Sequence, residues 1–129
     1  MTAEGDLATL LASLSATARD ERYVYVTVSH EDAETIGAAA SIVEDEGTTL
    51  VIPQAEADAL GLGYDYVAGW ITLEVYSALS AVGLTAVVSS ALAEAGISCN
   101  ILAGFHHDHL LVPEDRLDAA LEVLAGLSG

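Results

Sequence analysis

The sequence has no lysine and only three arginines, against twenty aspartate and glutamate residues, which gives a formal net charge of -17. A surface this acidic repels nucleic acid and anionic membranes, so proteins that bind either are excluded. The single cysteine, Cys99, excludes an internal disulfide and agrees with a reducing cytosol. No apolar run approaches the roughly 18 to 20 residues that span a bilayer. The N-terminal residues carry no basic segment before Arg19, so we expect a cytoplasmic protein without a signal peptide.

Apolar residues are plentiful. They make up 53% of the chain and give a mean hydropathy of +0.48, enough for one compact domain or for two very small ones that share a core. The acidic residues come in short runs that alternate with apolar stretches, which is typical of solvated faces and not of a disordered tail. Because screening relieves the mutual repulsion of these charges, the composition favours a halophilic protein, adapted to a salt-rich cytosol, over a specific cation-binding role.

An internal repeat organises the chain. Segments 41–61 and 101–126 share one layout: an apolar strand, a polar turn, an apolar strand that ends in proline, and an acidic helix closed by glycine. Pro53 and Pro113 bring the two copies into register, and each stands where a strand ends and a helix begins.

Hydrophobic periodicity predicts the elements of each half. In the second half, apolar residues at helical spacing predict a helix over 84–95, closed by Gly96. The other elements of that half are strands at 70–76, 97–104 and 106–113 and a helix at 117–124. The first half predicts strands at 23–28, 40–45, 48–52 and 66–76 and helices at 30–40 and 54–60. Segment 7–16 fits a helix and a strand equally well.

Two βαββα units in tandem predict an α+β fold with a ferredoxin-like arrangement, in which an antiparallel sheet carries helices on one face. We place the first unit at residues 1–65 and the second at residues 66–129. Exposed strand edges in so small a chain favour pairing with a second copy, so a homodimer is expected. The sequence has no phosphate-binding loop, dinucleotide fingerprint or serine-hydrolase elbow, and no cofactor is expected.

The stretch VGLTAVVSSALAEAGISCNILAG, residues 82–104, resembles the signature of ACT domains, which are small ligand-sensing modules of amino-acid metabolism. The wider runs EGTTLVIP, WITLEVYSALSAVGLTA and GISCNILAGFHHDHLLVP resemble a family of short stand-alone tandem ACT proteins, and also the ACT repeats of aspartokinases and of CASTOR-type arginine sensors. The resemblance covers roughly residues 5–127. It implies two ACT units of the βαββαβ type in a regulatory protein without catalytic activity. Such proteins bind a small molecule, usually a free amino acid, at an interface between ACT units.

The resemblance also implies an effector site between the loop after the first strand of the second unit and the start of its second strand. Its residues are Ser77, Ala78, Val82, Gly83 and Leu84 on the loop and Ser98, Cys99, Asn100 and Ile101 on the strand. The chain departs from the pattern at Ser98, where many ACT effector sites have asparagine. Chemically, amides at a helix start suit a carboxylate, and Gly83 permits its close approach. The alternative is that Gly83 only eases a tight turn.

The segment FHHDH, residues 105–109, leaves several interpretations open. The repeat register places it at a hairpin turn and the start of the next strand, with His107 and His109 on one face. These two histidines with Cys99 as a third ligand suit a metal ion, so a small metal-binding protein or metal-dependent enzyme is the alternative function. A His/Asp acid/base pair is a second interpretation. In the third, the hairpin lines the ligand interface: His107 or His109 donates to a bound carboxylate, and Asp108 holds an ammonium group.

Overall fold

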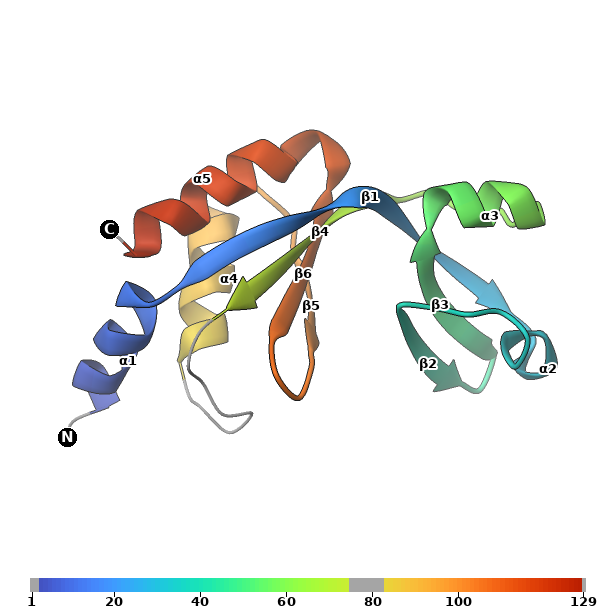
Figure 1. Cartoon of the computed structure of the whole chain (residues 1–129), viewed down its shortest axis with the longest axis horizontal. Helices are drawn as coiled ribbons and strands as arrows, with labels where there is room; N and C mark the ends of the chain where they lie inside the picture. Colours follow the sequence, from blue (N-terminus) through green and yellow to red (C-terminus); the bar gives the residue numbers. More distant parts are fainter. Residues whose placement is uncertain (1–2, 75–82, 129) are drawn as a thin grey trace. The chain divides into compact units, whose positions relative to one another are not determined.

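The computed structural model describes residues 3–74 and 83–128, and Figure 1 traces its elements. In chain order these are α1 (Ala3–Ala12), β1 (Ser15–Val28), α2 (His30–Ala33), β2 (Ala40–Glu44), β3 (Gly47–Pro53), α3 (Gln54–Leu60), β4 (Val67–Glu74), α4 (Leu84–Glu94), β5 (Asn100–Ala103), β6 (Asp108–Pro113), the short 3-10 helix η1 (Glu114–Arg116) and α5 (Leu117–Ser128). The strands are hydrogen-bonded in the order β2-β3-β1-β4-β6-β5. No helix within the two described ranges is long and apolar enough to cross a bilayer.

The chain forms two compact units. We call Asp20–Ala68 the central unit, and Met1–Arg19 together with Gly69–Gly129 the terminal unit. Strands β1 and β4 each contribute residues to both units. The division at residues 65 and 66 that the repeat pattern suggests remains a prediction.

In the terminal unit, α4 and α5 cover one face of the strands (Figure 1). Helix α4 places Leu84, Val88 and Leu92 on one stripe, and each of these side chains is at most 2% exposed. The same core holds alternate residues of the strands and one side of α5: Ile71, Leu73, Leu110, Val112, Leu117, Ala120 and Leu124. Full burial of a side chain of leucine size stabilises the fold by about 1.5–3 kcal/mol. The sheet is therefore held to its helices by apolar contact.

In the central unit, β3 lies between β1 and β2 and is antiparallel to both. The β1–β3 register runs from Tyr23 opposite Pro53 to Val28 opposite Thr48. Helix α3 starts directly after Pro53, as predicted, and ends at Gly61 with a φ of 70°. The core of this unit consists of alternate strand residues and one residue of α3: Val24, Val26, Leu50, Ile52 and Ala57. The α+β fold with antiparallel strands and helices on one face is thus as predicted.

Segment 7–16 contains parts of two elements and is neither one helix nor one strand. Helix α1 ends at Ala12, and the Ser13 hydroxyl donates to the Leu10 carbonyl at 2.9 Å just past this end. Strand β1 then begins at Ser15. The leucines before Ser13 follow helical spacing and the residues after it follow strand alternation, so both patterns overlap in the segment.

Two predicted elements are shorter by at least three residues in the structure. The helix expected over 30–40 is confined to α2, because the Ala39 N–H donates to the Val51 carbonyl at 2.9 Å and draws the chain into the sheet. The strand expected from Ile97 begins three residues later. The reason is that the Ile97 N–H still donates to Leu92 at 2.9 Å, across Gly96 in the left-handed conformation that ends α4. The end of the strand predicted at 70–76 lies outside the described residues.

Candidate functional site

The loop side of the predicted effector site is described only in part. Ser77, Ala78 and Val82 lie outside the described residues. Gly83 is the N-cap residue of α4 with a φ of 101°, in the left-handed region that favours glycine. Leu84 is 2% exposed and belongs to the core. Gly83 therefore serves the turn into α4, and Leu84 presents almost no side-chain surface to a ligand.

The strand side of the predicted site alternates between solvent and core. Ser98 and Asn100 are exposed, whereas Cys99 and Ile101 pack partly against the core of the terminal unit. Burial raises the pKa of the Cys99 thiol, which favours the neutral thiol over the nucleophilic thiolate. The polar side chains that this strand offers to a ligand are therefore those of Ser98 and Asn100.

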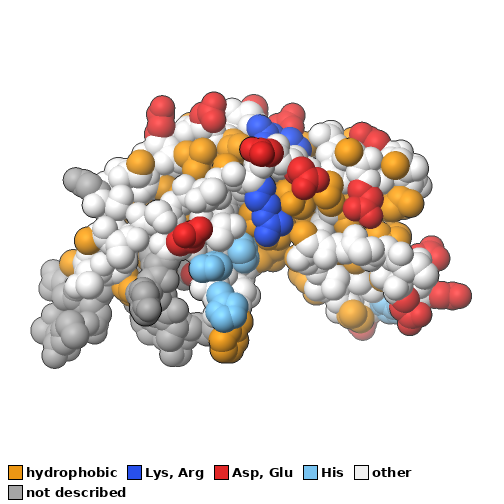
Figure 2. Space-filling view, viewed as in Figure 1, with side chains coloured by type: hydrophobic (Ala, Val, Ile, Leu, Met, Phe, Trp, Pro, Cys, Tyr) orange, Lys and Arg blue, Asp and Glu red, His pale blue; other side chains and the backbone are white. Residues whose placement is uncertain are grey.

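Residues 104–107 form the turn of the β5–β6 hairpin, as the repeat register predicts. The Gly104 N–H donates to the His107 carbonyl at 2.9 Å, and a Cβ on Gly104 would lie only 2.8 Å from that oxygen. Phe105 and the two histidines after it are exposed, and Figure 2 shows histidine side chains gathered over this hairpin. Because β6 begins at Asp108, His107 lies in the turn, and the predicted strand alternation does not apply to it.

His109 is held by side chains of the neighbouring strand β4. The Trp70 indole Nε1–H donates to its Nδ1 at 3.2 Å, and the Thr72 hydroxyl oxygen lies 3.1 Å from the same nitrogen. An indole nitrogen only donates, so Nδ1 of His109 is the acceptor and the ring proton is on Nε2. The guanidinium carbon of Arg19 lies 4.0 Å above the centre of the Trp70 ring, a cation–π contact.

The surroundings of His109 favour its neutral form. Desolvation lowers its pKa most, and the positive charges of Arg19 and His107 lower it further. Asp108 acts in the opposite direction. A neutral ring is also what the hydrogen bond from Trp70 requires, so geometry and electrostatics agree.

The residues proposed as metal ligands are not brought together. Within residues 3–74 and 83–128, no group of three or more His, Cys, Asp or Glu side chains is placed to hold a metal ion. His107, His109 and Cys99 therefore do not form the three-ligand set that a catalytic zinc site needs. The described part of the chain gives the metal-dependent alternative no support.

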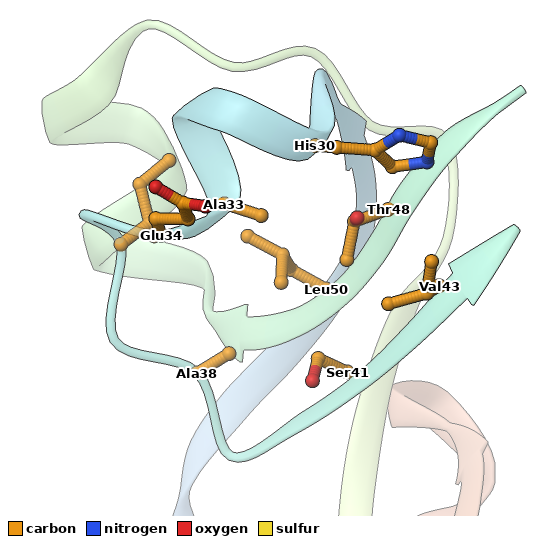
Figure 3. A pocket seen from close by; sticks show the side chains of 9 residues that line it. His30, Ala33, Glu34, Ala38, Ser41, Val43, Thr48 and Leu50 are labelled. Carbon is orange, nitrogen blue, oxygen red and sulfur yellow. The ribbon is translucent and has the colours of Figure 1, made fainter.

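A cavity of about 390 Å³ lies in the central unit, on the helix-bearing face of β2 and β3 (Figure 3). Its lining comes from α2 and the segment after it and from the two strands: His30, Ala33, Glu34, Ile36, Ala38, Ser41, Val43, Thr48 and Leu50. Ser41 pairs with Leu50 and Val43 with Thr48, so these four side chains share one face of the ladder. None of these residues was predicted from the sequence to form a site.

The cavity exists because the connection before β2 is short. Residues 29–39 join β1 to β2, whereas residues 75–99 join β4 to β5, a connection more than twice as long that includes α4. In the central unit the corresponding helix has four residues, and only Ala33 and Ile36 of this connection pack, partly buried, against the core. The strand face that α4 covers in the terminal unit is therefore incompletely covered in the central unit.

The cavity combines an apolar floor with a few polar side chains. Leu50 is 1% exposed and Thr48 is 4% exposed. The His30 side chain lines one side of the cavity and is held in place by a hydrogen bond from its Nε2 to the Glu44 carbonyl, at 2.6 Å. The Ser29 hydroxyl accepts from the Asp32 N–H at 3.0 Å and caps α2. Figure 3 shows Glu34 at one end of the cavity, His30 and Thr48 at the other, and Leu50 between them.

The repeat register relates this cavity to the predicted site. Superposing Pro53 on Pro113 relates Ala38 and Ser41 to Ser98 and Ile101, and Thr48 to Asp108. Residues of the first repeat that correspond to the predicted effector site thus line a cavity. These residues were predictable from the repeat, because the register between Pro53 and Pro113 transfers the predicted effector site from the second repeat to the first.

Comparisons with known proteins agree with the repeat. Family models described as ACT domain match residues 2–69 and residues 66–126. A crystal structure of a Vibrio cholerae protein of unknown function, titled a possible transport protein, is 36% identical over 99% of this chain and 100% of its own, with a TM-score of 0.90. No curated protein matches this chain.

Aspartate kinase structures share the fold at low identity. The regulatory subunit of aspartate kinase from Thermus thermophilus is 10% identical over 87% of this chain and 95% of its own, with a TM-score of 0.65. A structure of aspartokinase alpha and beta subunits is 15% identical, covers 89% of this chain and 96% of its own, and has a TM-score of 0.60.

Proposed function

Since this chain belongs to the ACT domain family and contains two ACT domains in tandem, we propose that it is an amino-acid-sensing regulatory protein without catalytic activity. ACT domains are typically ligand-binding regulatory domains, and the aspartate kinase structure that shares this fold is a regulatory subunit. The proposal places the ligand site within the central unit, and the predicted site of the second repeat is the alternative location.

The cavity in the central unit is the observation that carries this proposal. Its volume of about 390 Å³ falls within the roughly 300–1,000 Å³ of small-molecule sites, at the end suited to a small ligand. Such sites are mostly apolar with a few polar groups that fix orientation. The apolar floor around Leu50 suits an aliphatic side chain, and the Ser41 and Thr48 hydroxyls and the Glu34 carboxylate supply polar contacts.

The polar groups of the cavity suit binding better than catalysis. A nucleophile needs a base within hydrogen-bond reach and a group that orients the base. Here the His30 Nε2 donates to the Glu44 carbonyl, which leaves Nδ1 as the acceptor of the ring, and among the described residues no cavity hydroxyl donates to it. The other cavity side chains are hydroxyls, one carboxylate and apolar groups.

A thermal-shift screen of the twenty amino acids in molar salt tests the proposal. We expect at least one to raise the melting temperature by several degrees, because a hundredfold excess over Kd adds about 2.7 kcal/mol of stability. Thr48→Val keeps the side-chain shape, removes a cavity hydroxyl and should weaken this shift, whereas Thr17→Val, at an exposed site on β1, should not. If none of the twenty shifts the wild type, amino-acid sensing is wrong.

Asn100→Ala separates the two candidate sites, because Asn100 is exposed on β5 within the predicted site of the second repeat. We expect this variant to keep the ligand-induced shift. If Asn100→Ala removes the shift and Thr48→Val retains it, the ligand binds at the second repeat and not in the cavity.

We also propose that the protein is a halophilic cytoplasmic homodimer. The support is the net charge of -17 and the edge strand β2, on which Ile42 and Val43 are 49% and 77% exposed. An exposed apolar edge strand is a template for pairing with a second copy. Light scattering in molar salt should show twice the 13.3 kDa chain mass; only the monomer at tens of micromolar would contradict the dimer.

A further inference from the structure

The lining of the cavity in the central unit also restricts the class of ligand, and this inference rests on the function proposed above. Among the described residues, the lining includes one carboxylate, that of Glu34, and no arginine, and the sequence has no lysine. We propose that the cavity selects an aliphatic compound with an ammonium group at one end and a carboxylate at the other. Basic α-amino acids and ω-amino acids both belong to this class.

The ammonium end is assigned by electrostatics. A ligand carboxylate beside Glu34 would place two negative charges together, which is unfavourable, whereas an ammonium group there forms an ion pair. The net charge of -17 gives the protein a negative potential, which also favours an ammonium group over a carboxylate. A compound with net negative charge is therefore disfavoured at this end of the cavity.

The carboxylate end is assigned by the hydroxyl of Thr48. Thr48 is 4% exposed and lies with His30 at the end of the cavity opposite Glu34 (Figure 3). Its hydroxyl can donate a hydrogen bond to a carboxylate oxygen. His30 Nε2 already donates to the Glu44 carbonyl, so this nitrogen does not compete for the ligand.

The arrangement of the two polar ends, with apolar side chains between them, sets the shape of the ligand. Leu50 lies between Glu34 and Thr48, and Ala33 and Ile36 also line the cavity (Figure 3). Each CH₂ group of a methylene chain that packs on this apolar surface is removed from water, which makes the free energy of binding more favourable. An α-amino acid with a neutral side chain carries both charges on one carbon, so its charges are not separated by an apolar chain. A ligand with separated charges can contact Glu34 and Thr48 at the same time.

Four compounds of matched carbon chain test the class: lysine, 6-aminohexanoate, norleucine and hexanoate. Calorimetric titration in molar salt measures each Kd, because a Debye length of about 3 Å suppresses general attraction of cations to the acidic chain. We expect lysine and 6-aminohexanoate to bind about tenfold more tightly than norleucine, from one charge-assisted contact. Hexanoate should bind most weakly.

The variant Glu34→Gln should bring the affinity for lysine down to that for norleucine. Glu31→Gln is the matched control, because Glu31 is exposed like Glu34, does not line the cavity, and loses the same charge. The control should keep the wild-type preference. Equal weakening by both variants would assign the preference to net charge and overturn the role of Glu34.

The result also distinguishes this inference from the proposed function. If norleucine or glutamate binds as tightly as lysine, the protein still senses amino acids, but the ligand class inferred from the two cavity ends is wrong. If these four compounds and the twenty amino acids all fail to bind the wild type, the proposed function fails as well.

Discussion

Replacing Ala33 by leucine tests whether the cavity in the central unit is the ligand site. Ala33 lines the cavity and packs partly against the core of this unit. Leucine adds three carbon atoms, about 2.4 kcal/mol if all are buried at ~0.8 kcal/mol each. Ordering the longer side chain costs about 0.5–1 kcal/mol. The 390 Å³ cavity has room for the addition, so Ala33→Leu should stabilise the ligand-free chain by about 1.5 kcal/mol.

The assay is thermal unfolding in molar salt with and without the amino acid that gives the largest shift. For a chain of 129 residues, about 1.5 kcal/mol corresponds to roughly 5 °C in Tm. Ala33→Leu should therefore melt higher than the wild type without ligand and show almost no ligand-induced shift. Ala39→Leu is the control, because Ala39 is exposed and does not line the cavity. A full ligand-induced shift in Ala33→Leu would refute the site, and a lower Tm without ligand would refute the estimate of open space.

Three further predictions concern packing, pH and salt. Gly69→Ala should destabilise the chain by about 1–3 kcal/mol, because the added Cβ would lie 2.8 Å from a Leu117 methyl carbon. The control Gly63→Ala should leave the stability unchanged, because its Cβ would meet nothing within 4 Å. Chemical denaturation measures the free energy of unfolding of both variants. Because desolvation, the Arg19 charge and His107 hold the pKa of His109 below its ordinary value of 6.5, the unfolded chain takes up this proton first as the pH falls. The stability of the wild type should then decrease below about pH 6.5. If the melting temperature of a His109→Asn variant falls with pH as much as that of the wild type, His109 is not the cause. Lowering salt from molar to tens of millimolar should lower the melting temperature through charge repulsion, and an unchanged melting curve would exclude salt adaptation.

The fold was predictable because its periodic patterns are long and repeated. The apolar stripe of α4 and the two strand–proline–helix junctions at Pro53 and Pro113 each predicted an element that the structure contains. The short helix α2 was not predictable in length. Ser29 and the acids after it start a helix well, but pairing of Ala39 with Val51 then stops it, and such tertiary contacts override local propensity.

The site was less predictable, because it depends on contacts between distant residues. The hairpin at 104–107 followed from the repeat register, but the donor to His109, Trp70, is 39 positions away and comes from a neighbouring strand. The cavity was missed because it results from a connection that is too short to cover the strands. A sequence motif records the residues that are present, whereas this cavity reflects a helix that is only four residues long in the first repeat.

The missing cover has a consequence for stability that hydrogen exchange can measure. In the terminal unit, Leu110 is 0% exposed beneath a core that includes three large side chains of α4, worth about 1.5–3 kcal/mol each. Its equivalent Leu50 is also buried, at 1% exposed, but it borders the cavity and α2 supplies no comparable stripe above it. A ligand in the cavity would cover lining residues that are still accessible, among them Ala33, Ile36 and Val43. It should therefore slow exchange at β2 and β3 amides more than at β5 and β6 amides. Equal slowing in both hairpins would indicate a general effect of the ligand, and slowing confined to β5 and β6 would place the ligand at the second repeat.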